Sequence, residues 1–249
     1  MSPKKALPLW QNRNVLAPLV RPFYRPYPFH NIPHVQKTTN LGIAVAEQAI
    51  AHGIEIDTSV LPLAGYTHDA GNWFMPGRDH PFKTAEAFSA NVAWRIGQAL
   101  GMPKPKLELA CDMIESSGPD KPCITPEAKA LSQGDLMAGG LLDEPIIFLN
   151  GTYRLYKESK IIGGEPLAHP SRPQALATDF VRFGSVCHDK LGRLVSEDLS
   201  IGDYDRDDEG RSLFVMRAEY NLNLLTPRLM TDFLSKHMFE IVNYGSPAV

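Results

Sequence analysis

The sequence predicts an all-α fold, and three patterns support this. Apolar residues recur at helical spacing in most segments, most clearly over 229–241. Helix-starting signals recur as well, because Asn31 and Thr125 are each followed by a proline within two residues. Gly53 and Gly101 then stand where the periodic segments before them end, as expected of helix stops.

The composition is that of an ordinary globular protein. The 249 residues are 43% hydrophobic and 21% charged, which suits one large domain over 1–249 or a domain with an insertion. The net charge of −3 argues against a general nucleic-acid binder. No apolar run approaches the roughly 20 residues of a membrane helix, so we expect no membrane partner. The three cysteines lack a CxxC spacing and fit a reducing, cytoplasmic location.

Nine helices are expected in chain order. Their predicted spans are about 7–20, 31–52, 57–69, 83–100, 105–116, 125–138, 144–160, 208–222 and 226–241. Residues 21–30 separate the first two and contain three prolines and four aromatic residues. Because proline fixes φ and removes a donor, this segment should be an extended, packed lead-in.

Residues 160–207 break the helical pattern. Their glycines and prolines predict loops, and 181–187 with 194–196 predict two short strands around a turn at His188-Asp189. The acidic residues of 203–209 predict a solvated loop that caps the next helix. We therefore expect a surface insertion with a loop and β-hairpin near the pocket mouth, outside the core.

Histidines and aspartates at helix ends form the candidate site. His34 lies in the first turn of the 31–52 helix, and His68-Asp69 ends an apolar helix. Asp135 lies between Leu131 and Leu136, so its carboxylate should face inward. A buried, unpaired carboxylate is very costly, so it should be paired or bound to a metal. Two imidazoles and two carboxylates suit one divalent ion, which could be Mn, Fe, Co, Ni, Zn or Mg.

The order His, His-Asp, Asp resembles that of the HD-domain superfamily of metal-dependent phosphohydrolases. The segment 29–34, Phe-His-Asn-Ile-Pro-His, is similar to the Tyr-His-Asn-x-x-His that begins the first core helix of its small nucleotidase-like members. The segment 85–90 is similar to an Asn-Glu-x-x-Ser-Ala found in one branch. The resemblance covers about 27–140 well, 208–244 loosely and 160–207 not at all.

This resemblance implies one HD-type helical bundle, with a core of about 27–156 and 208–244 and an insertion at about 160–207. It implies hydrolysis of a nucleotide or related phosphate ester at a metal held by four ligands. The implied ligands are His34, His68, Asp69 and Asp135. Two-metal members have further histidines between the His-Asp pair and the last Asp. Only His80 lies there in this chain, so one metal is expected.

The residue that would act as general base is not obvious. Many HD proteins have an acid three positions after the Asp of the pair, but this chain has Asn72, which cannot accept a proton. His80 and Glu86 are the nearest substitutes, so the candidate catalytic residues are Asp69, His80 and Glu86. Glu86 is equally an acid favoured in a first helical turn by the helix dipole.

Three nearby side chains are candidates for binding the phosphate. Arg25 and His30 lie in the lead-in just before the first ligand, and Lys83 lies near a helix N-terminus, where anions are favoured. Two other functions remain open. An HD-type iron oxygenase would need a second metal, and Asn72 favours a non-catalytic HD-fold nucleotide-binding protein. The sequence is compatible with a homo-oligomer.

Overall fold

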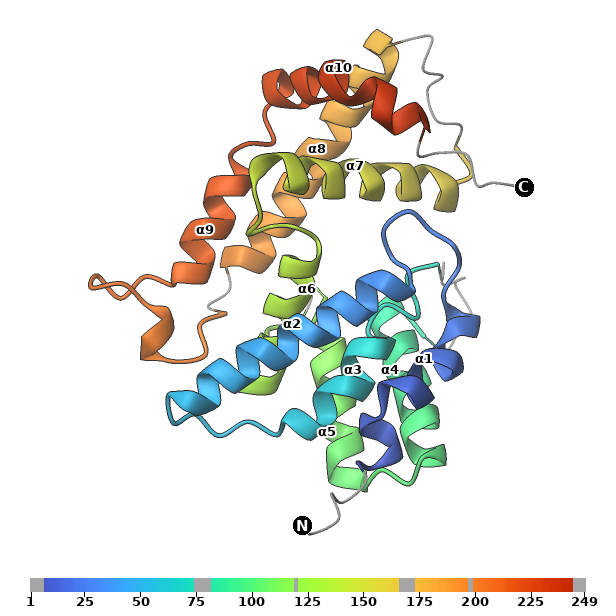
Figure 1. Cartoon of the computed structure of the whole chain (residues 1–249), viewed down its shortest axis with the longest axis vertical. Coiled ribbons are helices and arrows are strands. Elements are labelled where there is room, and N and C mark those ends of the chain that lie inside the picture. Colours follow the sequence, from blue (N-terminus) through green and yellow to red (C-terminus); the bar gives the residue numbers. More distant parts are fainter. Residues whose placement is uncertain (1–6, 74–81, 119–120, 166–172, 197–198, 244–249) are drawn as a thin grey trace, which may run out of the picture.

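The computed structural model describes residues 7–73, 82–118, 121–165, 173–196 and 199–243, and this part of the chain is all-helical (Figure 1). Its α-helices are α1 (Arg13–Val20), α2 (Ile32–Ala51), α3 (Leu61–Thr67), α4 (Ala85–Ala99), α5 (Lys104–Glu115), α6 (Pro126–Ala138), α7 (Pro145–Ile162), α8 (Pro173–Ser196), α9 (Leu213–Leu222) and α10 (Pro227–Asn243). Short 3-10 turns are Leu9–Gln11, Arg21–Phe23, Thr58–Val60 and Asp203–Asp205. None of the described helices is long and apolar enough to span a membrane.

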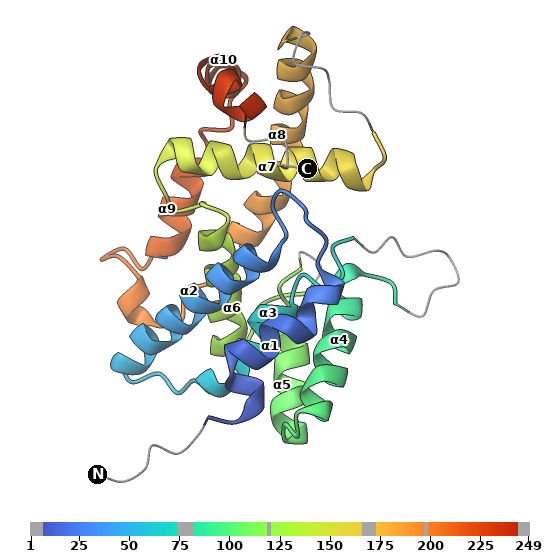
Figure 2. The same ribbon diagram turned by 45° about the vertical axis from the view of Figure 1, so that its right-hand side comes forward.

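The helices form two groups that share a core. Helices α1–α6 make the lower part of Figure 1, and α7–α10 lie above them, an arrangement that Figure 2 also shows. One continuous apolar cluster joins the groups, since it contains Leu131 of α6, Tyr156 of α7 and Phe180 of α8. The side chain of Asn221 on α9 donates to the carbonyls of Leu141 and Asp143, which fixes the turn between α6 and α7.

Helices α2 and α6 pack closely, and this contact positions two candidate ligands. Gly134 makes it possible, because a Cβ at this position would collide with the backbone of Gly42. His34 lies at the start of α2, and Asp135 follows Gly134 directly on α6. The small residues therefore let the two helix backbones approach until the two side chains can meet.

The predicted starts of α2 and α6 are confirmed. The Asn31 side chain accepts a hydrogen bond from the amide of His34, and that of Thr125 accepts one from Ala128. Both caps satisfy amides that have no partner within the helix. Asp57 caps the 3-10 turn ahead of α3 in the same way, by accepting from the amide of Ser59. Local polar side chains thus define where these elements begin.

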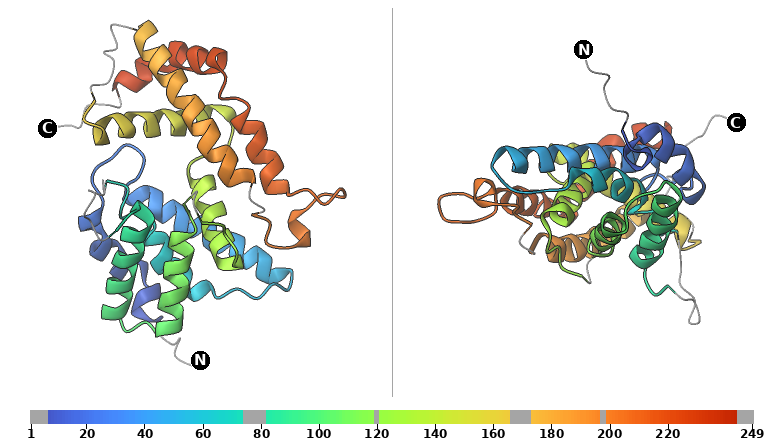
Figure 3. Two further views of the ribbon diagram at one scale, coloured as in Figure 1. Left: turned by 180° about the vertical axis from the view of Figure 1, so that it is seen from behind. Right: turned by 90° about the horizontal axis from the view of Figure 1, so that it is seen from below.

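The predicted β-hairpin is wrong. Residues 173–196 form the single helix α8, which Figure 3 (left) shows beside α9 and α10. Leu176, Phe180 and Cys187 are buried on its inner face, at helical spacing. His188 and Asp189 lie on its exposed side, with 47% and 77% of their side chains accessible, and not at a turn. The β-branched and aromatic residues of 181–187 suggested a strand, but packing against the helical core overrides this weak preference.

The prediction that 160–207 lies outside the core is also wrong. Phe180 is fully buried, and Leu199 is 1% exposed. The segment after α8 packs on α6, where Gln133 donates to the carbonyl of Leu199 and Lys129 to that of Ser200. This part of the chain is an integral layer of the bundle.

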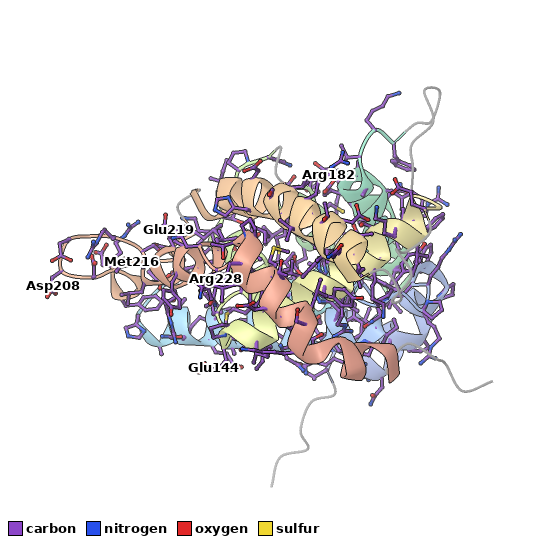
Figure 4. The ribbon with its side chains drawn as sticks, turned by 90° about the horizontal axis from the view of Figure 1, so that it is seen from above. Glu144, Arg182, Asp208, Met216, Glu219 and Arg228 are labelled. Atoms are coloured by element: carbon purple, nitrogen blue, oxygen red, sulfur yellow. The ribbon has the colours of Figure 1, made fainter. Side chains whose placement is uncertain are left out.

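In the acidic loop before α9, Asp203, Asp208 and Glu209 are exposed, as predicted, but the loop does not cap that helix. Asp208 lies in the loop that projects from the bundle in Figure 4. Asp207 organises the loop by accepting from the amide and guanidinium of Arg211. Helix α9 begins later than predicted, at Leu213, and its cap is Ser212, which accepts from the amide of Val215.

Candidate metal centre

Four side chains from three helical segments meet in the lower group of helices. They are His34 at the start of α2, His68 and Asp69 directly after α3, and Asp135 near the end of α6. One ligand atom from each lies within 4.8 Å of all the others. The predicted convergence of these residues is therefore confirmed.

The imidazole nitrogens face the two carboxylates. Nε2 of His34 lies 2.9 Å from Oδ1 of Asp135 and 3.2 Å from Oδ2 of Asp69. Nε2 of His68 lies 3.0 Å from the same Asp69 oxygen and 3.3 Å from the same Asp135 oxygen. The two nitrogens and two oxygens thus surround one small volume, with both histidines almost fully buried.

These short contacts leave polar atoms of the cluster without a hydrogen-bond partner. Nε2 of His34, Nε2 of His68 and Oδ2 of Asp69 are all buried without a hydrogen-bond partner. Buried polar atoms are costly to leave unsatisfied, so each needs an explanation. A divalent cation among them would satisfy all three, and nitrogen and oxygen donors suit such an ion. The residues present therefore fit a metal ion.

A surrounding layer of hydrogen bonds orients these side chains. Nδ1 of His68 lies 2.9 Å from the carbonyl oxygen of Gly65. A carbonyl can only accept, so Nδ1 carries the proton and the Nε2 lone pair of the neutral ring faces the cluster. Asn72 donates to Oδ1 of Asp69 at 2.7 Å, and Thr38 donates to Asp135 at 3.4 Å. Asn72 therefore holds a ligand in place, a role that its amide can perform although it is not a base.

The cluster perturbs the pKa of each member. Burial alone would lower the pKa of His34, but Asp135 and Asp69 outweigh it and raise that pKa to about 9. Burial also opposes the charged form of His68, yet the same two carboxylates raise its pKa well above the usual value. Burial favours protonation of Asp69, but His68 and His30 hold its pKa well below its ordinary range. Without a metal, the cluster is an internally paired set of ions.

The metal-free protein should lose stability as the pH rises through about 9. His34 has a pKa of about 9 when folded, against 6.5 for an ordinary histidine. Its protonated form therefore stabilises the fold fully below pH 6.5, and this contribution, at most roughly 3 kcal/mol, is lost as the pH passes about 9. Urea unfolding with a chelator between pH 6 and 10 would measure it. A divalent ion should reverse the trend, because ligation needs neutral imidazoles. An unchanged free energy of unfolding without metal would contradict this.

A histidine–glutamate pair lies beside the cluster. Nε2 of His30 is 4.0 Å from Oδ2 of Asp69, and its Nδ1 is 2.5 Å from Oε1 of Glu158. The other oxygen of Glu158 accepts from the amides of Phe29 and His30, at 2.9 and 2.8 Å. Only 1% of the Glu158 side chain is exposed. Glu158 on α7 thus joins the upper helices to the site and orients the His30 ring.

The sequence points to His30 but not to Glu158 or Tyr24. Lys157 and Ser159 give the sequence around Glu158 the character of an exposed helix face, so no local signal marks it. The hydroxyl of Tyr24 donates to the carbonyl of Tyr66. Burial, with Asp69 and Asp135 nearby, raises its pKa well above the usual value, so it stays a neutral phenol next to the site.

Arg25, Lys83 and Glu86 are not part of the four-residue cluster. The guanidinium of Arg25 lies 5.3 Å from the centre of the Trp73 ring. Lys83 is exposed, and the carboxylate of Glu86 packs against Gly118. His80 lies outside the described residues. Among the described residues, His30 lies beside the cluster, with Nε2 4.0 Å from Oδ2 of Asp69, and it is the candidate for proton transfer that the structure supplies.

Comparison of the chain with protein-family models, with curated proteins and with solved structures found no match in any of the three. The function is therefore inferred from the geometry of the site and the pattern of the sequence.

Proposed function

We propose that this protein is an HD-type, metal-dependent phosphohydrolase that acts on a nucleotide or related phosphate ester. One observation carries the proposal. Two buried imidazoles converge with two partly buried carboxylates, and three of their ligand atoms are buried without hydrogen-bond partners. The order of these residues along helices of an all-α bundle is that of the HD superfamily, which supports the choice of reaction class.

The proposed metal site would hold one divalent ion through His34, His68, Asp69 and Asp135. When bound, such an ion polarises a phosphoryl oxygen and lowers the pKa of a coordinated water. Asn72 and the carbonyl of Gly65 keep Asp69 and His68 in the orientation that ligation needs. Loss of such hydrogen bonds behind a ligand typically lowers metal affinity or activity by about 10- to 100-fold.

His30 is the residue we assign to proton transfer. Glu158 accepts the Nδ1 proton of His30, so the lone pair of the neutral ring is on Nε2, which faces Asp69. Nε2 can therefore accept a proton from the attacking water. A base oriented by a buried carboxylate would thus replace the acid that many HD proteins have at the position of Asn72.

A non-catalytic nucleotide-binding protein is the second candidate, because Asn72 occupies the position at which many HD enzymes have an acid. One experiment separates the two. The purified protein, loaded in turn with Mn, Fe, Co, Ni, Zn or Mg, should release phosphate or pyrophosphate from at least one member of a panel of nucleotides and phosphate esters. Chelation and Asp69→Ala should both abolish release. Tight binding of one compound without turnover would establish the binding protein instead.

A further inference from the structure

A pocket of about 190 Å³ opens next to the candidate metal centre. It lies between the start of α2, the turn after α6 and the first half of α7, where α7 crosses above α2 in Figure 1. His34 lines this pocket as well as the metal cluster. Part of its wall is backbone, because a Cβ at Gly151 would collide with the carbonyl oxygen of Gly139. A ligand in the pocket would therefore be an immediate neighbour of a group at the metal.

Two cations line the pocket from opposite sides, Lys37 on α2 and Arg154 on α7. Lys37 follows His34 by three residues, so it lies about one helical turn, ~5 Å, along α2 from the cluster. Arg154 precedes Glu158 by four residues on α7, so it lies about one helical turn from the glutamate that orients His30. Asn31 and Asn150 add uncharged hydrogen-bonding groups.

The pocket has more positive than negative charge. Arg154 uses Nε to donate to the carbonyl of Pro28 at 2.6 Å, and in the part of the chain that the structure describes it forms no ion pair. Its terminal nitrogens keep their capacity to donate. Lys37 lies 3.7 Å from Asp143, an exposed pair that is weak in water. Burial lowers the pKa of nearby Lys157, and the charge of Arg154 lowers it further, as expected where cations accumulate.

We propose that Lys37 and Arg154 bind a second phosphate group of the substrate, next to the phosphate that is cleaved at the four-residue cluster. This inference rests on the proposed function and narrows its substrate to a class, the diphosphates and bisphosphates. A phosphate oxygen pair matches the planar donors of arginine, and lysine adds a point charge. A volume of about 190 Å³ holds a phosphate group but is smaller than the roughly 300–1,000 Å³ of pockets that enclose whole drug-sized ligands.

Calorimetric titration of the metal-loaded, full-length protein with inorganic pyrophosphate and with inorganic phosphate tests this. Pyrophosphate should bind at least about 10-fold more tightly than phosphate, since it reaches both the metal and the two cations. Lys37→Gln and Arg154→Gln should each weaken pyrophosphate binding about 10-fold or more, with little effect on phosphate. Arg154→Lys should restore part of the loss. Asp143→Asn should strengthen pyrophosphate binding, because it removes the competing carboxylate.

Lys104→Gln is the matched control, because Lys104 is also an exposed helical lysine paired with an acid, Glu108. It should bind both anions as the wild type does. Metal content and the melting temperature of each variant show whether it remains folded. Equal affinity of the wild type for the two anions, or wild-type pyrophosphate binding by the Lys37→Gln/Arg154→Gln double variant, would overturn the proposal.

The proposed function and this second phosphate site can fail separately. If monophosphate esters are hydrolysed and the double variant is unaffected with diphosphates, the phosphohydrolase stands and the second site is wrong. If no compound is hydrolysed but pyrophosphate binding needs Lys37 and Arg154, the second site stands and the hydrolase is wrong.

Discussion

His68→Ala should yield a folded protein that no longer retains a divalent metal and whose kcat/KM falls by more than about 100-fold. Nε2 of His68 is buried and lies between Asp69 and Asp135, at 3.0 and 3.3 Å. Loss of a hydrogen bond that orients a ligand already lowers metal affinity or activity about 10- to 100-fold. Loss of the ligand itself should lower them more. Elemental analysis after gel filtration, together with kinetics at saturating metal, would measure both effects.

The chain contains its own control for this experiment. His188 and Asp189 are also adjacent, but they lie on the exposed side of α8. A His188→Ala/Asp189→Ala variant should keep full metal content and activity. If the two variants retain equal amounts of metal, the four-residue cluster is not a metal site.

Glu158→Gln should lower kcat about 100-fold, while KM and the melting temperature stay close to the wild-type values. The amide oxygen of Gln should face the amides of Phe29 and His30, because these two donors need an acceptor. The amide NH₂ then faces Nδ1 of His30, which must become an acceptor, so the ring proton moves to Nε2. A ring with this tautomer cannot take a proton from water, and general base catalysis contributes about 10²–10⁴-fold.

Glu158→Ala should in addition lower the free energy of unfolding by about 2–4 kcal/mol, since it leaves buried donors without an acceptor.

Glu127→Gln is the matched control for Glu158→Gln. Glu127 is likewise a buried glutamate that accepts from a backbone amide, that of Asp57 at 2.8 Å, but it lies at the other end of α6 from Asp135. It should leave kcat unchanged. If Glu158→Gln has wild-type kcat, Glu158 has only a structural role and His30 is not the base.

Most of the helices could be predicted because their signals are local. Asn31 and Thr125 cap the first turns that follow them, and this depends on only three or four residues of sequence. The stretch 181–187 was wrongly predicted as a strand because its local sequence does not decide between strand and helix. Its β-branched and aromatic residues suit either structure, and contacts made by Phe180 across the core decide for the helix.

The candidate metal residues could be predicted from sequence because each occupies a helix end or an apolar helix face, with a side-chain type that chemistry restricts to few roles. Glu158, Lys37 and Arg154 could not, since an isolated charged residue on a helix is ordinarily solvated. Their importance depends on the packing of α7 over the start of α2. That packing involves contacts more than a hundred residues apart, such as Glu158 to His30.

The sequence by itself thus determined the all-helical class, the starts of helices such as α2 and α6, and the four residues of the cluster, because capping, periodicity and ligand chemistry act locally. Tertiary structure alone decided that α8 belongs to the core and that a buried glutamate orients His30. It also decided which cations face the site. Burial and contacts between segments remote in the chain decide these outcomes. They set the energy of a charged or polar group far more than its neighbours in sequence do.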